Sequence, residues 1–235
     1  MAVKPVSREN LSSQLYNSLR AALMEGQFSP GQRLTISAVA EEYGTSITPV
    51  REAIFRLVSE RALEVRAATS VQVPRLSPAD LREIVRIRIE LEGLAAYRVG
   101  EIATDEQLAE LERINADFIK AAAVDSAEAA RINRAFHFAI LRFAGMPIVE
   151  GICENMWVLM GPFLRIFHER IPVRQLTGDD HKHYNILAAL KRHDAEAAKR
   201  AMQEDVAWSE ALVQMLEREE AEAADAAPPA KPARR

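Results

Sequence analysis

The chain contains a single cysteine, Cys153, among its 235 residues. One thiol cannot form an intrachain disulfide, and nothing suggests a secreted protein held together by disulfides. Because Cys153 follows Ile152 in an apolar stretch, we expect a buried, inert thiol. The N-terminal residues lack the apolar core of a signal peptide, and no apolar run approaches the roughly 20 residues needed to span a bilayer. We therefore expect a cytoplasmic protein without membrane contact.

Glycine is also scarce, with nine residues in the chain. None of them forms the glycine-rich loop that cradles phosphates, and the sequence carries no motif of a catalytic nucleophile. These absences argue against an enzyme. The composition is otherwise ordinary for a soluble globular protein, with 49% hydrophobic and 27% charged residues. The length suits one or two domains with a real core.

The net charge of −4 does not indicate a nucleic-acid-binding protein when the whole chain is considered. The charge is unevenly distributed, however. Residues 1–76 hold nine Lys and Arg against seven Asp and Glu, whereas the remaining residues hold 21 against 27. A mildly basic N-terminal part followed by an acidic remainder is compatible with a DNA-binding module attached to a domain that need not contact DNA.

The first 76 residues predict a winged helix-turn-helix. Leucine and alanine at helical spacing indicate a first helix that Gly26 ends, and a turn at Pro30-Gly31 follows. Thr35 is placed to cap a short second helix, which ends at Gly44. Two short alternating segments then read as strands of a hairpin, joined by residues 67–70. The predicted elements are helices over 10–26 and 37–43, a third helix from residue 46, and strands over 63–66 and 71–73.

The third helix has the features of a DNA-reading helix, whose N-terminal side chains point at base edges in the major groove. Ser46 or Thr48 caps it, and Pro49 is tolerated in the first turn, where amide donors have no helical partner. Ile47, Thr48 and Arg51 lie on the face opposite the core. The residues predicted to face the core are Val50, Ile54, Leu57 and Val58.

Arg51 is the predicted reader of a base or a phosphate. Its guanidinium can bond guanine in a bidentate manner, which is worth roughly 1–3 kcal/mol of discrimination. The alternative is a surface ion pair of Arg51 with Glu52 or Glu41.

After residue 76 the pattern becomes helical almost without interruption. Starts are marked by Ser77-Pro78-Ala79-Asp80 and by the capping box that begins at Thr104. Further starts are predicted at Asp125 or Ser126, Pro147, Thr177 and Asp194. The sequence therefore predicts a mainly α protein, in which the winged helix-turn-helix of residues 1–76 precedes an all-α antiparallel bundle over 77–216. Residues 217–235 are charged and then Pro-rich, which predicts a disordered tail.

The motif PGQRL at 30–34, followed by TPVREAI at 48–54, resembles the GntR family of transcription regulators. This resemblance implies that the recognition helix and the wing bind operator DNA. Ile47 stands where the family usually has arginine, and Ser70 replaces the wing glycine. Ile47 cannot hydrogen-bond a base but can pack on a thymine methyl, so the preferred operator is expected to differ. The predicted DNA-binding residues are Ser46, Ile47, Thr48, Pro49, Arg51, Thr69 and Ser70.

Residues 77–216 resemble the all-helical C-terminal (FCD) domain of the FadR-type branch of that family. The resemblance rests on Arg88 with Glu92, NRAFH at 133–137 and the segment from His183 to Met202. It implies a dimeric domain that binds an organic acid, in some members beside a divalent metal ion. The metal-site positions, usually Asp and three His, are Asn133, His137, His183 and Asp205 here. Two imidazoles, a carboxylate and an amide oxygen can hold zinc or a similar ion while leaving room for an effector carboxylate.

The resemblance also assigns Arg88, with His137 and His183, to the effector, because a guanidinium suits a carboxylate. The alternatives are an i, i+4 pair of Arg88 with Glu92 on the surface, and a lost metal site whose pocket binds the effector directly. We interpret three other histidines as surface residues: His168, His181 and His193. Larger apolar residues are predicted to fill the core or to line the pocket: Trp157, Met160, Phe163 and Phe167.

The prediction is a homodimeric regulator, most simply a repressor, that binds pseudo-palindromic double-stranded operator DNA under the control of a small-molecule effector. Two rival classes remain. One is a constitutive DNA-binding protein without a ligand, which a domain lined only by packed apolar residues would favour. The other is a metal-dependent enzyme, because two histidines and a carboxylate also occur in non-haem iron sites.

Overall fold

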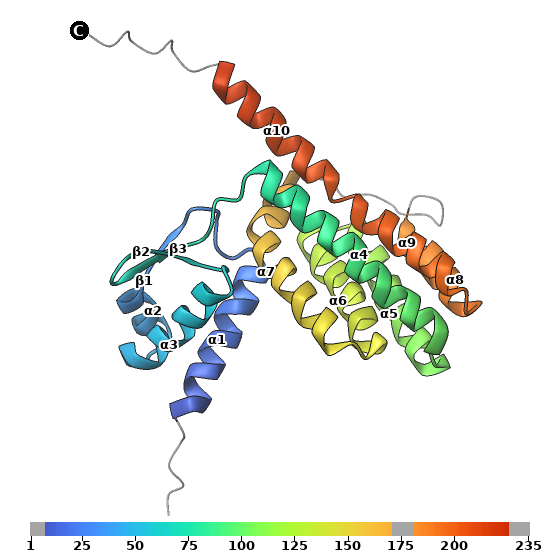
Figure 1. Cartoon of the computed structure of the whole chain (residues 1–235), viewed down its shortest axis with the longest axis horizontal. Coiled ribbons are helices and arrows are strands. Elements are labelled where there is room, and N and C mark those ends of the chain that lie inside the picture. The colour runs from blue at the N-terminus through green and yellow to red at the C-terminus, as the bar shows by residue number, and fades with distance from the viewer. Residues whose placement is uncertain (1–7, 171–180, 226–235) are drawn as a thin grey trace, which may run out of the picture.

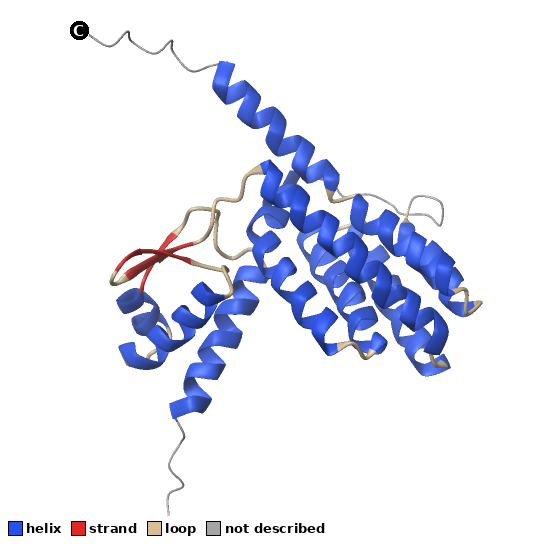
Figure 2. Cartoon of the chain, viewed as in Figure 1, coloured by secondary structure: helices blue, strands red, loops and turns tan. Residues whose placement is uncertain are grey.

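The computed structural model describes residues 8–170 and 181–225. A small N-terminal part, here called the head (residues 8–76), lies beside a larger helical domain (residues 77–225) (Figure 1). Strands occur in the head, and the helical domain is α-helical throughout its described residues (Figure 2). The predicted mainly α architecture with two successive parts is therefore confirmed.

The head is a winged helix-turn-helix, as predicted. Its three strands form an antiparallel sheet in the order β1-β3-β2. The first strand was not predicted, because its partner β3 lies far along the chain; it pairs Arg33 with Gln72 and Thr35 with Ser70. The elements are α1 (Arg8–Met24), β1 (Arg33–Thr35), α2 (Ile36–Glu42), α3 (Ile47–Ser59), β2 (Glu64–Ala67) and β3 (Ser70–Gln72).

Local signals in the sequence explain where the helices of the head begin and end. Gly26 follows α1 with a φ of 67°, a left-handed conformation that glycine adopts without steric cost. The Thr35 hydroxyl accepts a hydrogen bond from the Ala38 amide and caps α2. Ser46 occupies the cap position of α3 with extended backbone but makes no side-chain capping bond. Pro49 lies in the first turn of α3, as predicted.

Seven helices, counted over the described residues, form the helical domain. Predicted starts are confirmed at the capping boxes of Ser77 with Asp80 and of Thr104 with Gln107, and at the caps Asp125 and Asp194. The helices are α4 (Pro78–Ile102), α5 (Asp105–Ala122), α6 (Ser126–Ala144), α7 (Pro147–Arg170), α8 (Lys182–Lys191), α9 (Ala195–Ala207) and α10 (Glu210–Asp225).

The C-terminal boundary differs from the prediction. Helix α10 continues past residue 217 to Asp225, so the first part of the segment expected to be disordered is helical. Alanine and glutamate dominate this stretch, and both residue types favour the helix. Residues 226–235 lie outside the described residues, as does the helix start predicted at Thr177. No helix in the described part of the chain is long and apolar enough to cross a membrane.

The head packs closely against α7 of the helical domain. Val158 of α7 is buried in the hydrophobic core of the head with Leu19 and Leu23 of α1. A Cβ on Gly161 would overlap the backbone carbonyl of Leu23, so only glycine allows α1 to approach this closely. Arg20 of α1 also pairs with Glu154 of α7 at 3.0 Å. Helix α7 therefore forms a large part of the interface between the helical domain and the head.

Candidate functional sites

The exposed face of α3 presents the residues predicted to read DNA. Ser46, Ile47, Thr48 and Arg51 are all exposed. In the part of the chain that the structure describes, the Arg51 guanidinium makes no ion pair, so the alternative pairing with Glu52 or Glu41 is not observed. Its charge is therefore free for a base or a phosphate.

The wing and the start of α3 contribute unequally to this surface. Thr69 is exposed at the tip of the hairpin and Ser70 is half-buried beside it. Pro49, in contrast, is buried, so its side chain is turned away from the DNA-reading face and its place in the predicted set reflects the helix start. Phe55, further along α3, was not predicted to face this side and is 50% exposed. The sequence could have revealed this exposed position, because Phe55 lies outside the helical spacing of the core residues Val50, Ile54 and Leu57.

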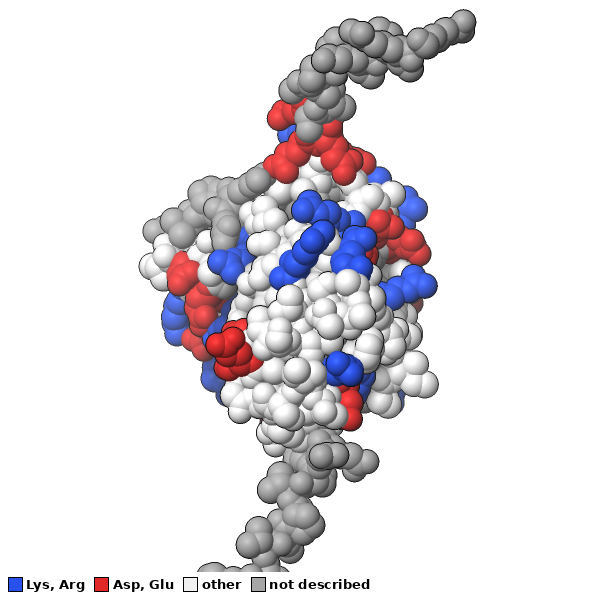
Figure 3. Space-filling view, turned by 90° about the vertical axis from the view of Figure 1, so that its left-hand side faces the viewer, with Lys and Arg blue, Asp and Glu red and all other residues white. Residues whose placement is uncertain are grey.

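The head exposes several arginines on α3, on the strands and on the segments beside them. Figure 3 shows the face of the molecule formed by the head, where Lys and Arg side chains gather above a lower surface that carries little charge. Such a cluster suits the phosphate backbone, which supplies most of the sequence-independent binding to DNA. The exposed arginines of the head are Arg33, Arg51, Arg56, Arg61, Arg66 and Arg75.

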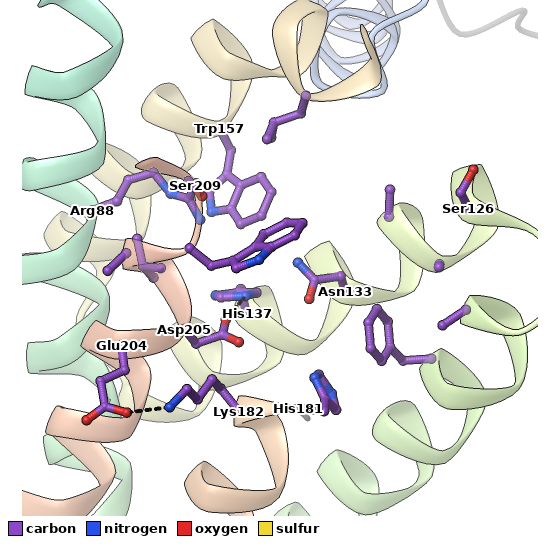
Figure 4. Close-up of a pocket in the computed structure, with 18 residues that line it drawn as sticks. Arg88, Ser126, Asn133, His137, Trp157, His181, Lys182, Glu204, Asp205 and Ser209 are labelled. Carbon is purple, nitrogen blue, oxygen red and sulfur yellow. Dashed lines mark hydrogen bonds and ion pairs between the residues drawn. The ribbon is translucent and has the colours of Figure 1, made fainter. Parts of the chain in front are cut away.

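A second candidate site is a cavity of about 440 Å³ inside the helical domain, here called the sensor pocket. Helices α4, α5, α6, α7 and α9 and the start of α8 contribute to its walls (Figure 4). Polar and charged side chains point into it, which differs from a core of packed apolar residues. The predicted residues among those that line it are Arg88, Asn133, His137 and Asp205, with Trp157.

Three predicted metal-site residues lie together: His137 and Asp205 line the sensor pocket, and His183 is fully buried beside them and does not line it. The ligand atoms of His137, His183 and Asp205 lie within 4.8 Å of one another. The Asp205 carboxylate is 3.0 Å from Nε2 of His137 and 3.9 Å from Nε2 of His183. Asn133 lies one helical turn before His137, and its side chain extends into the pocket beside that ring (Figure 4). The structure therefore brings together all four residues proposed from sequence.

The His183 ring has one nitrogen in use and one without a partner. Nδ1 is 3.1 Å from the side-chain oxygen of Asn115. Nε2 is buried, and in the described residues no group hydrogen-bonds to it. An unsatisfied buried polar atom is costly and uncommon in native proteins. Because Asn115 can only accept at its oxygen, Nδ1 carries the proton and Nε2 presents a lone pair toward Asp205 and His137.

The His137 ring is oriented by a buried network around Glu92. The Glu92 carboxylate accepts hydrogen bonds from Nδ1 of His137 at 2.6 Å, from Nε of Arg88 at 2.6 Å and from the indole of Trp157 at 3.1 Å. The Arg88 guanidinium also stacks over the Trp157 ring, 3.8 Å from its centroid. The pairing of Arg88 with Glu92 is thus present, but it is buried and borders the pocket, whereas the alternative from sequence placed it on the surface.

Burial and charge set the protonation states in this network. Burial would raise the pKa of Glu92, but Arg88 and His137 lower that pKa to about 2. Burial would lower the pKa of His137, yet the Glu92 and Asp205 carboxylates raise it to about 9. Burial holds the pKa of His183 well below its usual value. The site therefore pairs two carboxylates with two cations, Arg88 and His137, beside one neutral imidazole.

His181 was predicted on the surface and is instead buried, so that interpretation was wrong. Its ring stacks on Phe118 with the centroids 4.6 Å apart, and its Nε2 is 3.0 Å from the Asn115 oxygen. The sequence did not place Asn115 and Glu92 against the histidines, because these two residues reach them from other helices. His193 is exposed, as predicted, whereas the side chains of His168 and Phe167 lie outside the described residues.

Several other expectations concern the surroundings of this site. Asp205 lies in the last turn of α9. The predicted buried thiol of Cys153 is confirmed, and burial raises its pKa to about 12. The large apolar residues Trp157, Met160 and Phe163 are buried, and Trp157 also lines the pocket.

Two protein families match separate parts of the chain. The family "Bacterial regulatory proteins, gntR family" matches residues 11–73, and the "FCD domain" family matches residues 83–207. The first match covers the head, and the second covers the helices that build the sensor pocket. The resemblance of the head to the GntR family and of the helical domain to the FCD domain is therefore confirmed.

Similar proteins of known family support the same assignment. The HTH-type transcriptional regulator McbR of Escherichia coli K12 is 38% identical over 83% of this chain and 89% of its own length. YdhC of Bacillus subtilis 168 is 30% identical over 79% and 83%, respectively. RspR of E. coli K12, an HTH-type transcriptional repressor, is 24% identical over 82% and 84%.

The structure of E. coli McbR/YncC superposes with a TM-score of 0.81 at 37% identity, over 87% of this chain and 97% of that one. These relatives are transcription regulators, which confirms the prediction of a regulator in place of an enzyme. The chain therefore belongs to the GntR family of bacterial transcription regulators, with a DNA-binding winged helix-turn-helix followed by an FCD domain.

Proposed function

We propose that this regulator senses an organic acid in the sensor pocket through a divalent transition metal ion, and that effector binding changes operator affinity. The observation that carries the proposal is the unpartnered, buried Nε2 of His183, which faces His137 and Asp205. Two imidazoles and one carboxylate form a donor set that suits zinc or a similar ion. The residues present therefore fit the metal ion that the sequence resemblance implied.

His137, His183 and Asp205 would hold the ion, with the Asn133 amide oxygen as a further donor. Glu92 and Asn115 each fix one histidine with Nδ1 protonated, which is the support that metal-ligating histidines generally have. When bound, the ion would supply a strong electrostatic anchor for a carboxylate group. Three or four protein ligands leave coordination positions open for such a group.

The charge of the site favours an anionic effector. With His137 protonated, the charges of Glu92, Asp205, Arg88 and His137 balance. Exchange of one proton for a divalent cation leaves the site with net positive charge. This balance, together with the charged and polar side chains among the largely apolar walls of the pocket, supports a ligand-controlled regulator over a ligand-independent DNA-binding protein.

We further propose that the active species is a homodimer that represses transcription. Two heads related by a two-fold axis match a pseudo-palindromic operator, which is the usual geometry for helix-turn-helix regulators. The name of the relative RspR, a transcriptional repressor, supports repression as the mode of action.

The proposal is tested by measuring operator affinity with and without effector. An operator is first selected from random duplexes by purified wild-type protein, and carboxylates are then screened for those that change its affinity. We expect His137→Ala and His183→Ala to bind the operator in the effector-free state but to lose the response. Arg142→Gln is a matched control, because Arg142 is an exposed residue of α6 paired with Glu110. Normal responses in both histidine variants would place the effector elsewhere.

Asn115 provides a test of the support given to His183. We expect Asn115→Ala to weaken zinc binding by roughly 10- to 100-fold, which is typical when an outer-shell partner is removed. Asn115→Asp retains an acceptor oxygen and should recover most of the affinity. Competition with a chromophoric chelator measures both values, and the near-ultraviolet circular dichroism spectrum reports whether the fold is intact. Equal affinities for wild type and Asn115→Ala would show that Asn115 does not position the ring.

A further inference from the structure

A second cavity lies between the head and the helical domain and has a volume of about 400 Å³. The end of α1 forms one wall through Met24 and Glu25. The first turns of α6 and the middle of α7 form the others, with Arg134 and Arg165 among the lining residues. We call this cavity the interdomain pocket. None of the functions described above uses it.

In the interdomain pocket, the positive charge of Arg134 is only partly balanced by neighbouring groups. Its side chain is only 17% exposed. One guanidinium nitrogen donates to the backbone oxygen of Met24 at 3.1 Å. Another lies 3.6 Å from the Glu25 carboxylate, which is longer than a hydrogen bond. These are its two polar partners among the described residues, and burial lowers its pKa.

The other carboxylates in the walls of this pocket form hydrogen bonds with other groups. Asp125 accepts hydrogen bonds from the amides of Ala127 and Glu128 and so caps α6. Glu128 forms two hydrogen bonds, at 2.7 and 2.6 Å, with Arg131. Glu25 is 42% exposed, and its second oxygen accepts a hydrogen bond from Gln27 at 2.9 Å. Glu25 is therefore a loose counter-ion that a better-placed anion can replace.

We propose that the interdomain pocket is a second ligand site, in which the Arg134 guanidinium binds an oxyanion group, a carboxylate or a phosphate, in competition with Glu25. The planar guanidinium fork matches the geometry of such groups and can bond them in a bidentate manner. The group can belong to a free ion. It can also be the far end of an effector held in the sensor pocket, since the two cavities share Ser126, Ala130, Trp157 and Leu164 in their walls.

The interdomain pocket is in direct contact with the DNA-binding head. Arg134 holds the last residues of α1, and it lies on α6 one turn before His137. An anion that draws Arg134 from Glu25 releases a contact between the helical domain and the head. An anion bound in the interdomain pocket is therefore expected to change how the head packs against the helical domain, independently of the metal site.

Isothermal titration of the full chain with inorganic phosphate, and with linear monocarboxylates and dicarboxylates of matched and increasing length, tests the site. We expect Arg134→Gln to weaken binding of at least one of these probes by about tenfold or more, because a charge-assisted hydrogen bond is lost. Arg142→Gln, the same change on the exposed face of α6, should bind like wild type. Glu25→Gln should bind severalfold more tightly, because it removes the competing carboxylate while leaving Arg134 intact.

The two sources of the oxyanion give different patterns. A free ion is indicated if phosphate binds equally well to wild type, His137→Ala and chelated protein. A spanning effector is indicated if dicarboxylates bind more tightly than monocarboxylates of equal length, and if His137→Ala and Arg134→Gln each remove the difference. The proposal is overturned if no probe binds, if Arg134→Gln binds them all as wild type does, or if Glu25→Gln leaves every affinity unchanged. The phosphate titration needs no metal, so its result does not depend on the sensor-pocket proposal.

Discussion

Replacement of Arg51 by alanine is expected to lower affinity for the selected operator by roughly 10- to 100-fold. A bidentate arginine contact to guanine is worth about 1–3 kcal/mol, and about 1.4 kcal/mol corresponds to a tenfold change in affinity. Arg51 is exposed near the start of α3 and makes no ion pair within the described part of the chain, so its loss removes no intramolecular contact. Fluorescence anisotropy with operator and scrambled duplexes measures the effect.

The comparison between the two duplexes decides which contact Arg51 makes. A base contact predicts a large loss on the operator and a small loss on the scrambled duplex, whereas a phosphate contact predicts similar losses on both. Arg142→Ala, in the helical domain, should leave both affinities unchanged. Wild-type affinity of Arg51→Ala for the operator would remove Arg51 from DNA recognition.

Zinc is expected to stabilise the chelated protein strongly, and Asp205→Asn to remove most of that stabilisation. A ligand present at 1,000 times its dissociation constant adds about 4 kcal/mol to the free energy of unfolding. In a protein of this size that corresponds to a rise in Tm of roughly 8–16 °C. Asp205 is the carboxylate shared by His137 and His183, so the change to a neutral amide removes the charged ligand and preserves its shape.

The neighbouring carboxylate provides a matched control for this measurement. Glu204 is exposed, lines the same pocket and pairs with Lys182 at 2.8 Å. We expect Glu204→Gln to retain the full zinc-dependent rise in Tm, measured by thermal unfolding with and without zinc after chelation. A similar loss in Glu204→Gln would indicate general attraction of cations to an acidic surface. An undiminished rise in Asp205→Asn would exclude Asp205 as a ligand.

The elements of the fold were largely predictable because their boundaries carry local signals. Ser77, Thr104, Asp125 and Asp194 each cap a helix through a side chain that bonds nearby backbone amides, so a few residues contain the whole signal. Strand β1 was missed because its hydrogen bonds come from β3, far along the chain. The end of the helical domain was placed too early, at residue 216, because the charged, Ala-rich end of α10 resembles a solvated tail.

In the sensor pocket too, the residues with a local sequence signal were predictable, and those brought together by long-range packing were not. Asn133 and His137 share a helix face at i, i+4 spacing, which sequence reveals directly. Asn115 and Glu92 meet the histidines only through the packing of α4, α5, α6 and α8, so no short motif contains them. His181 was misassigned for the same reason, since its burial depends on Phe118 of α5. The interdomain pocket likewise depends on how α1 packs against α6 and α7.

The most direct test of the account is elemental analysis of purified, untagged wild-type protein and of the His137→Ala/His183→Ala double variant, before and after chelation. The account predicts about one transition metal ion per chain in the wild type, as expected for a site with three or four protein ligands. It also predicts that chelation removes the ion and that the double variant lacks it. Wild-type protein that contains no such metal and takes up none on titration would contradict the proposed metal-dependent sensor.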